Sequence, residues 1–203
     1  NAGNNLTSGS GNSFFGTNAG QANTIGNSNV FVGENAGQAN VNGPSNVFLG
    51  AGAGTANVST GANVYVGANA GNVATAQQNV FVGGGSGSQS TSGGFNTFIG
   101  NLTGNTNRTG SNNTVIGTAA DVANGSLSYA TAIGAGSIVE SSNTIKLGRA
   151  LDTVVAPNRL TVGDSVFIDD GIIESQSLDA MSALIRGSLL VGDSTQPRGD
   201  MNV

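Results

Sequence analysis

Apolar residues recur at a fixed interval along the chain as far as residue 148. The recurring unit is five residues long and ends in Gly, as in Asn-Val-Phe-Val-Gly at 29–33 and Asn-Val-Phe-Leu-Gly at 46–50. The closing glycines lie at positions 16, 33, 50, 67, 83, 100, 117, 134 and 148, so the successive intervals are 17, 17, 17, 16, 17, 17, 17 and 14 residues. A short fixed period is typical of a solenoid, in which each repeat forms one coil.

The residues before each closing glycine predict a short strand. Four apolar-rich residues between Asn and Gly fit a buried β-strand, whereas Gly, Asn and β-branched residues throughout the period disfavour helices. We therefore expect an all-β fold: a parallel β-roll of about nine coils of about 17 residues over residues 1–148. The closing glycines suit turns that need a positive φ or a close approach of backbones, and seven of them belong to clear copies of the unit: Gly16, Gly33, Gly50, Gly67, Gly83, Gly100 and Gly117.

Both faces of each predicted strand carry large side chains. Side chains alternate along a strand, so the residues one and three before each glycine share a face, as Val32 and Val30 do. The residue between them points the other way and is aromatic in six successive copies: Phe14, Phe31, Phe48, Tyr65, Phe81 and Phe98. A coil of 17 residues is too thin to enclose both faces. We expect one face to fill the coil and the aromatic ladder to be covered by identical chains around an axis parallel to the rod, in a homotrimer.

An asparagine begins almost every unit and shares the face of the aromatic residue. We expect these side-chain amides to pair from coil to coil, as stacked Asn residues do in cross-β structures, and to be structural rather than ligand-binding. The ladder comprises Asn12, Asn29, Asn46, Asn63, Asn79, Asn96 and Asn113.

The repeat resembles the head domains of trimeric autotransporter adhesins. Residues 96–104 also match the form Asn-Thr-Phe-Ile-Gly-x-x-x-Gly found in phage-type tail fibres. The resemblance covers residues 1–148 and implies a left-handed parallel β-roll, with three rolls packed about a threefold axis. Two features depart from the adhesin pattern: the period of 17 is longer, and the middle residue is aromatic where the adhesins often have Ala. The last copy, at 142–148, is closer to the adhesin pattern.

Composition and charge narrow the chemistry that the chain can perform. The 203 residues include no Cys and no His, only 8% are charged, and Glu34 is the one charged side chain before Arg108. Without imidazole or thiol groups, and without a carboxylate pair on one face of the rod, we expect no enzyme activity, no cofactor and no metal site. The formal charge of −5 argues against nucleic-acid binding. No segment is apolar enough to insert into a membrane.

The pattern changes after Gly148, so we divide the chain into a β-roll at 1–148 and a C-terminal connector at 149–203. In the connector we expect a hairpin over 160–174 and a short helix that begins near Ser177. Two motifs there have ordinary explanations. Arg198-Gly199-Asp200 spells a tripeptide displayed by integrin ligands but follows Pro197 in a turn-like tail. Asp164, Asp169 and Asp170 could offer oxygen ligands to Ca²⁺, but their spacing is not that of a calcium loop.

These observations favour a non-enzymatic homotrimeric fibre or adhesin segment on the outside of a bacterial cell, which attaches to a host or environmental surface through a glycan or protein ligand. A tail fibre of a phage or of a contractile injection system would use the same fold. An ice-binding solenoid is a further alternative, for which Thr97, Thr114 and Thr131 form only a short column. We expect the loops at 41–45 and 88–90 to form the outward surface.

Overall fold

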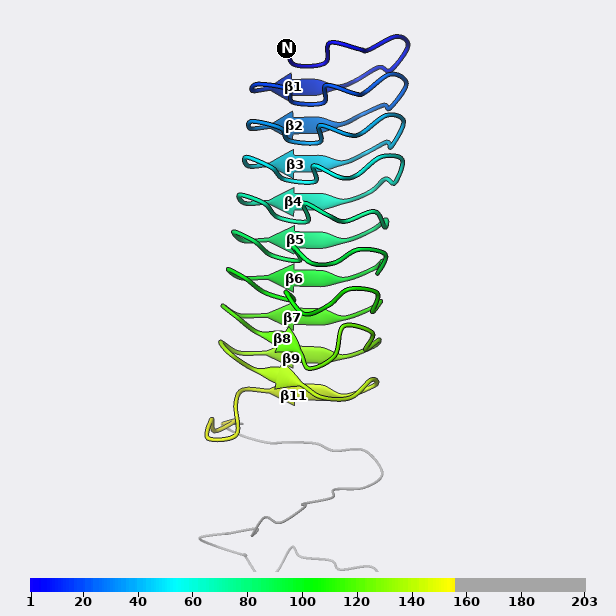
Figure 1. Ribbon diagram of the computed structural model, residues 1–203. Coiled ribbons are helices and arrows are strands. Elements are labelled where there is room, and N and C mark those ends of the chain that lie inside the picture. Colours follow the sequence, from blue (N-terminus) through cyan, green and yellow to red (C-terminus); the bar gives the residue numbers. More distant parts are fainter. Residues whose placement is uncertain (156–203) are drawn as a thin grey trace, which may run out of the picture. The chain divides into compact units, whose positions relative to one another are not determined.

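The computed structural model describes residues 1–155, and these form a parallel β-solenoid without a helix. Successive coils stack along one axis, with a strand of each coil in the same wall (Figure 1). Nine strands form one parallel sheet in the order β1-β2-β3-β4-β5-β6-β7-β9-β11, and β8 pairs with β10 in a second sheet. The strands are β1 (Ser13–Phe15), β2 (Val30–Val32), β3 (Val47–Leu49), β4 (Val64–Val66), β5 (Val80–Val82), β6 (Thr97–Ile99), β7 (Thr114–Ile116), β8 (Asp121–Val122), β9 (Thr131–Ile133), β10 (Ile138–Val139) and β11 (Ile145–Leu147).

The register of the large sheet follows the sequence period. Each strand pairs with the strand one repeat later, so that Phe31 lies opposite Phe48 and Phe48 opposite Tyr65. The nine strands bound eight turns, and the predicted parallel β-roll is confirmed. The hairpin and helix expected in the connector lie outside the described residues, as do the Arg198-Gly199-Asp200 motif and Asp164, Asp169 and Asp170.

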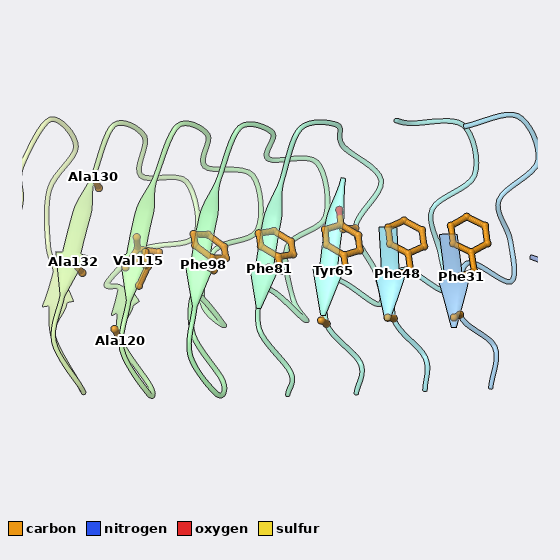
Figure 2. Packing of buried hydrophobic residues seen from close by; sticks show 14 of the residues in the cluster. Phe31, Phe48, Tyr65, Phe81, Phe98, Val115, Ala120, Ala130 and Ala132 are labelled. Atoms are coloured by element: carbon orange, nitrogen blue, oxygen red, sulfur yellow. The ribbon is translucent and has the colours of Figure 1, made fainter. Parts of the chain in front are cut away.

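The aromatic ladder fills the interior of the chain's own coils. Phe31, Phe48, Tyr65, Phe81 and Phe98 have no exposed surface, although only one chain is present. Their rings stack from coil to coil with centroids 4.8–5.0 Å apart (Figure 2). Phe14, in the first coil, is partly buried at the end of the stack. The prediction that neighbouring chains cover these rings is therefore wrong, and it is the other face of each strand that points outward.

A coil of 17 residues can hold a ring because the wall opposite the ring is made of very small residues. Gly54 lies over the ring of Phe48, where an added Cβ would come within 2.5 Å of a ring carbon, and Gly87 has the same relation to Phe81. Every coil with an aromatic ring has such a glycine six residues later. Where β7 has Val115 instead of a ring, the corresponding residue is Asp121. The second glycine of the repeat therefore provides the space for the ring.

The closing glycines bring the backbones of neighbouring coils together. The seven predicted turn glycines have φ between 127° and 139°. An added Cβ on Gly50 would lie 2.5 Å from the carbonyl oxygen of Gly67 in the next coil. A side chain at this position is excluded by conformation and by space.

The asparagine ladder links coils, but by a different hydrogen-bond pattern from the one predicted. Asn29, Asn46 and Asn63 are fully buried. The Oδ1 of Asn29 accepts a hydrogen bond from the backbone N–H of Asn46 (2.9 Å), and the Asn29 side chain donates to the carbonyl of Gly43 (2.9 Å). Each amide thus satisfies backbone groups that the short strands leave unpaired inside the coil.

Amide pairing from coil to coil occurs instead in a second asparagine column. Asn23 donates to Oδ1 of Asn40 (2.9 Å), and Asn40 donates to Oδ1 of Asn57 (3.1 Å). All three side chains are buried. Sequence reasoning missed this column, although its members recur at the same 17-residue interval.

Tyr65 is the one ring of the buried ladder with a hydroxyl, and that oxygen has no hydrogen-bond partner among the described residues. Burial raises the pKa of the Tyr65 hydroxyl, and the nearby Asn79 side chain offsets only part of this shift. Since an unsatisfied buried hydroxyl destabilises the folded state, we expect Tyr65→Phe to raise the free energy of unfolding by about 1 kcal/mol. Urea denaturation measures the change, and a lower stability of the variant would contradict the interpretation.

Candidate interaction surface

The outer face of the nine-stranded sheet is an apolar strip. Its two columns are the residues on either side of each interior residue, and they are exposed or half-buried. Val32 is 37% exposed, Ile99 40% and Ile133 39%. The first column is Ser13, Val30, Val47, Val64, Val80, Thr97, Thr114, Thr131 and Ile145, and the second is Phe15, Val32, Leu49, Val66, Val82, Ile99, Ile116, Ile133 and Leu147. We call these two columns the outer sheet face.

The outer sheet face carries no ionisable side chain along its whole length. Nine strands spaced about 4.8 Å apart give a strip about 40 Å long. A strip of this length and two side chains wide offers several hundred Å² of apolar surface, comparable with the roughly 800 Å² that one partner contributes to a standard protein interface. Exposed apolar surface of this extent marks an interaction site in a protein that must stay dispersed in water.

The ionisable groups of residues 1–155 are scattered rather than gathered into a reaction centre. Burial raises the pKa of Asp121, whose carboxylate accepts hydrogen bonds from the backbone N–H groups of Thr106 (2.9 Å) and Val122 (2.8 Å). Lys146 pairs with Glu140 at 3.2 Å at the end of the solenoid. Within residues 1–155 there is no pocket and no cluster of residues that could hold a metal ion.

The structure separates the predicted site residues into an interior set and an outer set. The aromatic and asparagine ladders are interior, so they cannot contact a ligand. Of the loops predicted to face outward, Val41, Pro44 and Ser45 are exposed, whereas Ser90 is fully buried. The outer sheet face was missed as the exposed surface, although the alternation of side chains along the strands had already placed its residues together.

The fold defines the class of protein: this is a repeat protein, a parallel β-solenoid with an aromatic interior. No family model, curated protein or solved structure matches the chain. No helix within residues 1–155 is long and apolar enough to span a membrane. Its function is therefore inferred from the geometry of its surfaces.

Proposed function

We propose that the chain is a segment of a non-enzymatic, homotrimeric surface fibre that extends or mediates attachment outside a bacterial cell. The observation that carries the proposal is the outer sheet face, an uncharged apolar strip that runs along every strand of the solenoid. A phage or injection-system tail fibre would be built in the same way. The two differ in the structure that holds the fibre rather than in the rod.

A second copy of the chain is the partner that best matches this face. The strip repeats at the spacing of the coils, so a partner must present apolar groups at the same spacing over the same length. An identical solenoid does so, and the absence of charge on the face means that identical faces do not repel each other. Packing around an axis parallel to the rods closes the assembly and buries all copies equally.

Trimerisation gives the rod a use in attachment. Three parallel chains present three copies of any surface site, so a weak contact with a surface is strengthened by avidity. The interior ladders and the inter-coil hydrogen bonds hold these copies at fixed spacings.

We expect light scattering to give a mass three times the 19.8 kDa of one chain. The double variant Val32→Lys/Ile99→Lys places two charges on the outer sheet face and should reduce the mass to that of a monomer, since an unpaired lysine is costly to bury in an interface. The matched control is Val41→Lys/Val58→Lys: these valines are 36% and 47% exposed but lie outside the outer sheet face. A monomeric wild-type protein, or equal masses for the two double variants, would overturn the assembly.

One observation favours a second candidate function. Thr97, Thr114 and Thr131 lie in successive strands of the outer sheet face, and each is followed two residues later by Ile. A flat array of β-branched residues of this kind could bind ice instead of another chain. The ice-binding candidate requires a monomer with its face free and predicts thermal hysteresis, which a trimer with a covered face does not give.

A further inference from the structure

A column of exposed residues follows the corner of the coil just before each strand of the large sheet. Every member has a left-handed backbone, with φ between 56° and 60°. All of the side chains are exposed. The column consists of Ser28, Ser45, Ala62, Gln78, Phe95, Asn112, Tyr129 and Asn143.

Two members of this corner column are aromatic where the backbone disfavours them. Phe95 has φ 59° and Tyr129 has φ 57°. Bulky side chains in the left-handed region are strained, and Asn, Asp or Gly usually take such positions. The rings gain no burial that would offset this strain, because Phe95 is 51% and Tyr129 62% exposed. Folding therefore gives no reason for aromatic residues at these two corners, and strain of this kind is typical of functional positions.

From Gln78 onward the corner column alternates between amide and aromatic side chains. The order is Gln78, Phe95, Asn112, Tyr129 and Asn143. Backbone hydrogen bonds between neighbouring coils fix the positions: the N–H of Phe95 donates to Gln77 O (3.2 Å), that of Asn112 to Gly94 O (3.1 Å) and that of Tyr129 to Ser111 O (3.0 Å). The two rings are thus two coils apart, at about 9.6 Å for coils spaced about 4.8 Å. Within residues 1–155 the side chains of Gln78, Asn112 and Asn143 make no hydrogen bond, so their amides are free for a ligand.

We propose that residues 78–143 of the corner column bind an extended, uncharged β-1,4-linked polysaccharide that lies along the solenoid. This inference rests on the proposed attachment function and names the ligand class. In such a chain successive sugars are turned over relative to each other, so the same sugar face recurs at every second unit. Rings two coils apart can stack on these recurring faces, and the intervening amides can donate to and accept from sugar hydroxyls.

Charge and polarity distinguish this ligand from other extended polymers. Aromatic stacking also binds single-stranded nucleic acid, but that requires a positively charged groove, and this chain has a formal charge of −5. An apolar peptide would leave the three amides of the column without partners. A neutral glycan uses both kinds of side chain.

The test measures retention of the full 203-residue chain on insoluble chitin and cellulose, with insoluble starch as the α-linked comparison. We expect retention on at least one β-linked polymer and none above background on starch. Phe95→Ser/Tyr129→Ser, which introduces the residue found at positions 28 and 45 of the same column, should lower retention about tenfold, as the loss of two stacking contacts predicts.

Leu102→Asn is the matched control. Leu102 is 51% exposed with φ 52°, but it lies in a different column, where Asn18, Asn35 and Asn69 occupy the equivalent positions. This variant should be retained like the wild type. Thermal unfolding should show that the serine variant melts no lower than the wild type, since serine already occupies this corner in two coils.

Three results would overturn the glycan site: no retention on either β-linked polymer, equal retention of the serine double variant and the wild type, or binding to single-stranded DNA in place of the glycan. Equal retention on starch would overturn the β-1,4 assignment. These outcomes are separate from the assembly. A trimer that is not retained removes only the glycan site, and a monomer that is retained removes only the trimeric fibre.

Discussion

Phe81→Ala will lower the free energy of unfolding by about 3–5 kcal/mol. Phe81 has no exposed surface and stacks between Tyr65 and Phe98, with ring centroids 5.0 and 4.8 Å away. Removing the ring leaves a cavity that the neighbouring coils cannot close, because inter-coil hydrogen bonds on both sides hold the spacing. Urea denaturation followed by circular dichroism measures the loss.

The control for this prediction is Phe95→Ala, which removes the same side chain from an exposed position. Phe95 is 51% exposed and adopts a strained φ of 59°, so its loss should change stability by less than about 1 kcal/mol. Equal effects of the two substitutions would mean that the buried ladder does not hold the coils together.

Gly50→Ala should be the most damaging of the small substitutions, with a loss of about 3 kcal/mol or more. Gly50 has φ 139°, and its added Cβ would lie 2.5 Å from the carbonyl carbon and oxygen of Gly67. The contact is with backbone, so no side-chain rotation can relieve it. The coils would have to separate locally, with loss of inter-coil hydrogen bonds.

Gly84→Ala is the matched control for the glycine prediction. Gly84 has no positive φ, an added Cβ would meet only the side-chain amide of Asn101 at 3.0 Å, and Ala51 and Ala68 occupy the equivalent position in earlier coils. This variant should unfold at about the same temperature as the wild type. A melting temperature for Gly50→Ala that equals the control would show that the close approach of the coils is not required.

The strands and their register could be predicted from sequence because both follow from the period. The 17-residue interval alone places Phe31 opposite Phe48, and the Asn and Gly at the ends of each unit fix where the short strands begin and end. Strand position required no knowledge of tertiary contacts, since every coil contacts mainly its two neighbours.

The direction of the two strand faces could not be predicted by judging the thickness of a coil. Interior volume depends on the opposite wall, and there the glycine six residues after each ring creates the room. The sequence contained a signal for this arrangement: Phe98 is followed by Gly104, whereas Val115 is followed by Asp121. Paired changes at the two positions indicate contact across the interior, and we had interpreted the second glycine only as a turn.

The surface sites were harder to predict for a different reason. An aromatic residue such as Phe95 or Tyr129 gives no indication of a left-handed backbone, because such residues normally avoid it. Only the stacking of coils shows that these two rings share a column with three amides. The partners of the asparagine ladder were ambiguous as well, since an amide can pair equally well with another amide or with backbone groups.

The hydrogen bonds between coils run along the stacking axis, and this determines how the solenoid responds to tension. A pull on its two ends loads these bonds one after another, so the coil at the pulled end separates first while those behind it stay wound. Each released coil of 17 residues adds about 55 Å of extended chain. A tether built in this way lengthens in steps and dissipates a sudden load instead of breaking at once.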